Sequence, residues 1–181
     1  MTYKALLTAG LLLVAPLTAC GDAFEPIFVL VPQPAEADLH DFVSSSLLDP
    51  SAFDLFARGA IRTDQITTWD FLFVVDPALG PTLVGRGAAL DSESDAGIQL
   101  MSFEFDDLTE APDNDYIVDQ PVPVSVGDVF AVRSRQSSSI SFRCRLFGKM
   151  EILAIEGSPA VATVRFVVNP NCEQRGVEPE A

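Results

Sequence analysis

Short runs in which hydrophobic and polar residues alternate recur along the chain and predict a mainly β fold of antiparallel strands. The strongest run covers residues 67–75, where Trp69, Phe71, Phe73 and Val75 occupy every second position. Alternation with aromatic and β-branched side chains is typical of a half-buried strand. Shorter runs at 52–57 and 82–90 predict two more strands in the first half.

Four runs in the second half are separated by brief polar turns and predict an antiparallel meander. They cover residues 129–135, 140–147, 150–155 and 161–168. Glycine-containing turns at 127–128 and 157–159 separate some of them, and Gly148 is expected to break the chain between two others. Little helix is expected; the best candidate lies within 97–108, where the periodicity is ambiguous.

The N-terminus carries an uncharged apolar run, Ala5–Leu17, after the basic residue Lys4. This run is shorter than the roughly 20 residues that span a bilayer, but it has the length of a signal-peptide core. Leu17-Thr18-Ala19-Cys20 follows and resembles the lipobox of bacterial lipoproteins. An ordinary cysteine near a cleavage site is the alternative.

The lipoprotein resemblance implies that residues 1–19 are a signal peptide and that Cys20 is the site of lipid attachment. The protein would then be exported and anchored to a membrane through Cys20. Gly21 does not favour retention at the inner membrane in such lipoproteins. The resemblance therefore implies the outer membrane, at the cell surface or the periplasmic face.

Composition divides the remaining chain into a tether, a domain and a tail. Residues 20–40 are rich in proline and acids and are expected to form an extended tether, although 28–31 could instead be a first edge strand. Residues 41–176 are assigned to one β domain, and 177–181 to a polar tail.

The charge balance limits the choice of partner. The chain has 11 Lys and Arg residues against 26 Asp and Glu residues, a net charge of −15. Such a surface repels phosphate groups, so nucleic acid is excluded as a partner.

Two cysteines are left if Cys20 carries lipid. An exported compartment permits disulfides, so Cys144 and Cys172 are expected to form an internal bridge. Two separate buried thiols are the alternative. A zinc site is not expected, because zinc usually takes additional Cys or His ligands.

Several segments in order along the chain resemble the HmuY-like lipoprotein domain. The resemblance is carried by Phe53-Asp54-Leu55, 67–73, 102–112, 127–134 and 148–166. It implies an antiparallel β domain of a surface lipoprotein. HmuY itself captures haem between two histidines, whereas this chain has a single histidine, His40. Haem is therefore not expected, and Met101 or Met150 is better interpreted as core packing than as an iron ligand.

No cofactor and no catalysis are predicted. His40 is the only residue that could serve as the base of a Ser-His-acid triad, and no G-x-S-x-G sequence is present. The leading hypothesis is a non-catalytic cell-envelope lipoprotein that binds an unidentified ligand, in a concave aromatic pocket near Trp69 or Phe71. The alternative is a structural or interaction lipoprotein with an exposed apolar patch that contacts another envelope protein. A haem or porphyrin carrier ranks third.

Two charged segments could bind ions. Residues 91–119 contain ten acidic residues and no Lys or Arg, which permits a weak calcium site but is more typical of solvated loops. Arg133, Arg135, Arg143 and Arg145 would share one face of a hairpin. Either they bind an anionic ligand or partner, or the protein's own acidic segment covers them.

Overall fold

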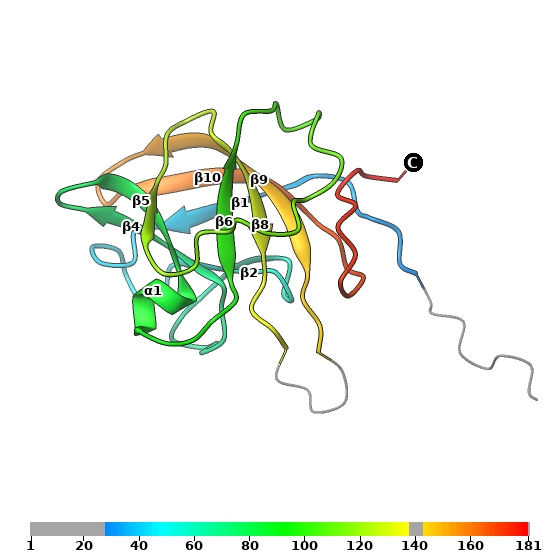
Figure 1. Cartoon of the computed structure of the whole chain (residues 1–181). Helices are drawn as coiled ribbons and strands as arrows, with labels where there is room; N and C mark the ends of the chain where they lie inside the picture. The colour runs from blue at the N-terminus through cyan, green and yellow to red at the C-terminus, as the bar shows by residue number, and fades with distance from the viewer. Residues whose placement is uncertain (1–27, 138–142, 181) are drawn as a thin grey trace, which may run out of the picture.

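The computed structural model describes residues 28–137 and 143–180, which form two antiparallel five-stranded sheets packed face to face (Figure 1). The first sheet has the strand order β1 (Ala35–His40), β10 (Val161–Val168), β9 (Phe147–Glu156), β8 (Val129–Arg133) and β6 (Gly97–Met101). The second has the order β3 (Gly59–Ile61), β2 (Ala52–Asp54), β4 (Phe71–Asp76), β5 (Gly80–Gly85) and β7 (Pro121–Pro123). The mainly β prediction is confirmed.

The main core lies between the two sheets, where alternate residues of facing strands meet. Phe53 of β2 packs edge-on against Phe166 of β10, with ring centroids 4.8 Å apart. Phe130 and Val132 of β8 point into the same core, as the alternation of this run predicted. Burial of such side chains is the main favourable term in folding.

A second apolar cluster covers the outer face of the first sheet. The connection between β6 and β7 contributes Phe105, Leu108 and Tyr116, which pack on Val129 and Phe147. Both faces of β8 and of the first half of β9 are therefore buried.

The predicted helix at 97–108 is wrong, and the predicted strand at 82–90 ends early. Residues 97–101 form β6, because all five pair with β8. The helix α1 instead spans Arg86–Leu90 and ends at Asp91, whose φ of 47° is left-handed. A Cβ on Gly87 would lie 2.6 Å from the carbonyl oxygen of Val118, so only glycine allows this approach.

Gly148 does not break the chain, contrary to the prediction. It lies inside β9, paired with Val132 on one side and Val168 on the other. A Cβ at this position would meet the carbonyl oxygen of Val167 at 2.6 Å. The glycine therefore marks a close backbone approach within the sheet.

The folded part extends beyond the domain limits of 41–176 at both ends. The expected tether contributes β1, an edge strand paired with β10, in which Leu39 is fully buried while Glu36 and Asp38 are exposed. At the other end Val177, assigned to the polar tail, lies fully buried in the outer cluster. The prolines and exposed acids of residues 20–40 led to the prediction of a tether, although this segment contains an edge strand. The core face of that strand is made of small residues and one leucine.

Candidate functional site

The four predicted patch arginines do not form one surface. The guanidinium of Arg133 lies 4.7 Å from the centre of the Tyr116 ring, and Arg145 pairs with Asp95 at 2.7 Å. Arg135 is partly buried and pairs with Asp54 and Asp70, while Arg143 is exposed. The alternative, in which the acidic segment 91–119 covers the arginines, therefore holds for Arg145, whose partner Asp95 lies in that segment, but not for Arg135, which pairs with Asp54 and Asp70.

Arg135 joins two buried carboxylates into one cluster. Its Nη1 lies 3.0 Å from Asp70 Oδ1 and 3.1 Å from Asp54 Oδ1. Asp70 also accepts hydrogen bonds from the backbone N–H groups of Arg135 and Leu55, each at 2.8 Å. The Asp70 side chain is fully buried, and this burial raises its pKa, although the nearby Arg135 charge acts in the opposite direction. The cluster links β2, the approach to β4 and the end of β8.

A polar cavity of about 370 Å³ lies beside this cluster. Its charged lining residues are Arg86, Arg135, Glu93 and Asp95. Arg86 donates from Nη1 to the Thr67 carbonyl oxygen at 3.0 Å. The mixture of charges leaves no strong preference for an anion, which weakens the predicted anionic-ligand role.

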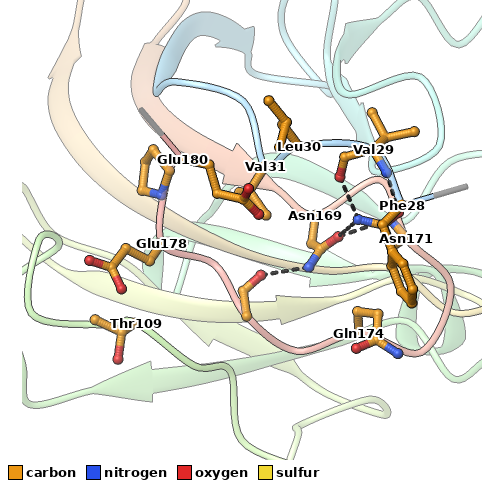
Figure 2. A pocket seen from close by; sticks show the side chains of 12 residues that line it. Phe28, Val29, Leu30, Val31, Thr109, Asn169, Asn171, Gln174, Glu178 and Glu180 are labelled. Atoms are coloured by element: carbon orange, nitrogen blue, oxygen red, sulfur yellow. Dashed lines mark hydrogen bonds between the residues drawn. The ribbon is translucent and has the colours of Figure 1, made fainter.

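A second cavity, of about 440 Å³, lies where the described N-terminal segment meets the C-terminal segment (Figure 2). An amide network forms part of its wall. Asn171 accepts a hydrogen bond from the N–H of Val29 and donates to its carbonyl oxygen, at 2.8 and 2.7 Å. Asn169 accepts from the Asn171 side chain at 2.9 Å and donates to the carbonyl oxygen of Gly176 at 2.7 Å.

The aromatic residues expected to line a ligand pocket belong to apolar clusters instead. Phe71 is fully buried between the sheets and Trp69 is 7% exposed. Neither residue lines the polar cavity beside Arg135 or the cavity between the two terminal segments. The aromatic-pocket signature of a small-ligand binder is not found at these positions.

Exposed apolar side chains gather on the loop that follows β1. We define the distal loop as residues 42–48; Phe42, Val43, Leu47 and Leu48 are exposed on it. His40 donates its N–H to the carbonyl oxygen of Pro50 at 2.8 Å and so closes the base of the loop. This loop lies at the opposite end of β1 from the described N-terminus (Figure 1).

Buried Asp41 organises the distal loop. Its carboxylate accepts hydrogen bonds from the Ser44 hydroxyl and the Ser44 N–H. The same carboxylate accepts from the N–H of Val75 on β4 at 2.9 Å. Burial alone would raise the Asp41 pKa, but these hydrogen bonds lower it below its usual value. The loop is thus fixed to β4.

Lys149 is a buried cation that the sequence pattern did not single out. It is 1% exposed, and its Nζ donates to the carbonyl oxygens of Phe105 and Leu108 at 2.8 and 2.9 Å. The ammonium also lies 4.6 Å from the centre of the Phe105 ring. Burial lowers the Lys149 pKa. Its position two residues after Phe147 in an apolar strand was the available signal.

The disulfide prediction is confirmed, since Cys144 and Cys172 are bonded. The bridge joins the segment before β9 to the turn after β10. The strand predicted at 140–147 lies partly outside the described residues, and its part at 143–146 is not a strand. It still runs beside the end of β8, because Ser134 donates its N–H to the Leu146 carbonyl oxygen at 2.9 Å.

The remaining candidates are not drawn together into a site. No group of three or more His, Cys, Asp or Glu residues is placed to hold a metal in the described ranges, so the acidic segment 91–119 offers no such group for calcium there. His40 lies at the end of β1 rather than in a tether. Cys20 lies outside the described residues. Across 28–137 and 143–180, no helix is long and apolar enough to cross a membrane.

Comparison with protein-family models, curated proteins and solved structures finds no match. The resemblances to lipoproteins and to the HmuY-like domain therefore stay predictions.

Proposed function

We propose that this is a non-catalytic, lipid-anchored protein of the cell envelope that contacts another envelope protein through the distal loop. The lipobox-like sequence ending at Cys20 supports export and anchoring. The Cys144–Cys172 disulfide is compatible with an oxidising compartment.

The observation that carries the interaction role is the ordered, apolar distal loop. Val43, Leu47 and Leu48 are 72%, 64% and 66% exposed. An exposed group of large apolar side chains is typical of an interaction site. The hydrogen bonds to Asp41 hold the loop in one conformation, so binding would cost little conformational entropy.

Charge suggests the chemistry of the partner surface. Asp49 directly follows Leu48 in the sequence, and the whole chain has a net charge of −15. A partner with an apolar centre and a basic rim would complement this surface.

The test is site-specific photo-crosslinking in the protein's own cells. A photoreactive residue replaces Leu47, and a matched one replaces Asp107, which is exposed in the connection between β6 and β7. We expect one protein adduct from position 47 that is lost in the Val43→Ser, Leu48→Ser double variant. The same adducts from both positions, or none from 47, would contradict the proposed contact. The mass of the purified protein tests acylation of Cys20 separately.

Capture of a small polar ligand is the second candidate. It is supported by the cavity beside Arg135, where Arg86 could bind a carboxylate and Glu93 an amine. Native mass spectrometry of protein extracted in mild detergent would then show an extra mass of small-molecule size. The Arg86→Gln variant should lose that mass.

A further inference from the structure

Three consecutive apolar side chains are exposed at the start of the described chain. Phe28, Val29 and Leu30 are 64%, 51% and 63% exposed. We call them the proximal strip. In Figure 1 this segment lies beside the C-terminal segment, at the opposite end of the molecule from the distal loop.

The proximal strip is fastened to the domain. Asn171 holds both backbone groups of Val29, with hydrogen bonds of 2.8 and 2.7 Å. The next residue after the strip, Val31, is buried in the outer cluster and accepts a hydrogen bond from the N–H of Glu180 at 3.2 Å. Figure 2 shows this arrangement around the cavity. The strip therefore keeps its side chains exposed while its backbone is held.

The position of the strip brings it close to a membrane if Cys20 is acylated, and to this extent the inference rests on the proposed function. Eight residue steps separate Cys20 from Phe28. A fully extended chain covers at most about 3.6 Å for each residue, so the strip lies within about 30 Å of the lipid anchor. Insertion of apolar side chains into the membrane interface is favourable, and side chains held at this distance can reach it.

We propose that the proximal strip is a membrane-contact surface that rests on a lipid bilayer and sets the orientation of the anchored domain. The charged residues around the strip indicate which lipid headgroups it would contact. The cavity beside the strip is lined by Glu178 and Glu180, and its described lining residues include no lysine or arginine. Zwitterionic headgroups, such as phosphatidylethanolamine, fit this surface better than anionic ones. The domain then projects the distal loop away from the membrane.

The experiment uses the acylated full-length protein in phosphatidylethanolamine–phosphatidylcholine vesicles. An environment-sensitive fluorophore is attached to a cysteine introduced by Leu30→Cys, and to a matched one introduced by Leu48→Cys. These leucines are 63% and 66% exposed, so the two probes begin in equally open positions. Nitroxide-labelled lipids in the same vesicles report contact with the bilayer by quenching.

We expect a blue shift and several-fold stronger quenching at position 30 than at position 48. Part of the signal at position 30 should be lost when anionic lipid is added. Equal quenching at both positions would overturn the proposal. A blue shift at position 30 without nitroxide quenching would indicate coverage by protein, including a second copy, and would also overturn it.

Acyl mass and vesicle flotation separate this inference from the proposed anchoring. A chain that carries acyl mass and floats with vesicles, but shows no quenching at position 30, is anchored without resting on the strip. A chain without acyl mass that does not float contradicts both proposals.

Discussion

Two cations in this protein, the partly buried Arg135 and the fully buried Lys149, are stabilised in different ways. Arg135 lies between two carboxylates, Asp54 and Asp70, which are themselves buried. Lys149 lies against two backbone carbonyl oxygens and the ring of Phe105, and no salt bridge to it is found within the described residues. Arg135 is thus stabilised by opposite charges, whereas Lys149 is stabilised by the dipoles of neutral groups.

The difference predicts how each site responds to loss of its cation. Removing one member of a buried ion cluster leaves the other charges without compensation, which is strongly destabilising. Removing a charge held by neutral acceptors leaves only two carbonyl groups unsatisfied, and it also abolishes the cost of burying the cation. The ion cluster should therefore be the more sensitive of the two.

The largest effect is expected from Arg135→Met. The substitution leaves the carboxylates of Asp54 and Asp70 buried without a cation, so the free energy of unfolding should fall by about 3–5 kcal/mol. Urea unfolding at neutral pH measures this change. The matched control is Arg143→Met at an exposed arginine, for which a change within about 0.5 kcal/mol is expected.

A companion variant tests the cause of that loss. Adding Asp70→Asn to Arg135→Met removes one of the stranded charges, so part of the lost stability should return. If the double variant is no more stable than the single one, uncompensated charge is not the reason for the instability.

A smaller effect is expected from Lys149→Met. Methionine fills similar space, but the carbonyl oxygens of Phe105 and Leu108 lose their donor. The free energy of unfolding should fall by about 1–2 kcal/mol. Amide hydrogen exchange should also rise in the segment 102–112, which the ammonium group fastens to the sheet. A loss as large as that of Arg135→Met would contradict the distinction between the two sites.

Features set by residue order along a strand could be predicted from the sequence. Alternation located β10 over the predicted range 161–168 and placed Phe130 and Val132 in the core, because side-chain direction in a strand follows directly from residue order. The disulfide could be predicted for a different reason: the lipobox resemblance left Cys144 and Cys172 as a pair.

Long-range contacts decided the features that could not be predicted. Gly148 was expected to be a break, yet the backbone of Val167 approaches it inside the sheet. Residues 97–101 became a strand through pairing with β8, and Leu39 of the expected tether entered the core through β1. Local periodicity contains no information about such partners.

In the candidate sites, too, local alternation could be predicted from the sequence, whereas long-range contacts could not. Alternation placed Arg133 and Arg135 on one face of a hairpin, but Arg135 lies beyond the end of β8 and turns inward to Asp54 and Asp70. Those carboxylates are 81 and 65 residues away in sequence. The burial of Lys149 could not be predicted from its strand alone, because its acceptors come from the 102–112 segment.

The smallest effect is a pH dependence that tests how completely Arg135 offsets the burial of Asp70. Burial raises the Asp70 pKa above the ordinary 3.8, despite the lowering by Arg135. The folded state therefore binds this proton more tightly than the unfolded state does. The contribution to stability is fully present below pH 3.8 and is lost as pH rises through the folded-state pKa.

Asp41 provides the opposite case within the same molecule. Its pKa is lowered by hydrogen bonds although burial opposes them, so its contribution is present above pH 3.8 and is lost as pH falls through the folded-state pKa. Unfolding free energies measured from pH 3 to 7 should show the wild type losing stability relative to Asp70→Asn as pH rises. Relative to Asp41→Asn the wild type should gain stability over the acidic part of that range. Slopes of the same sign for both variants would mean that Arg135 compensates Asp70 as fully as the N–H and O–H donors compensate Asp41.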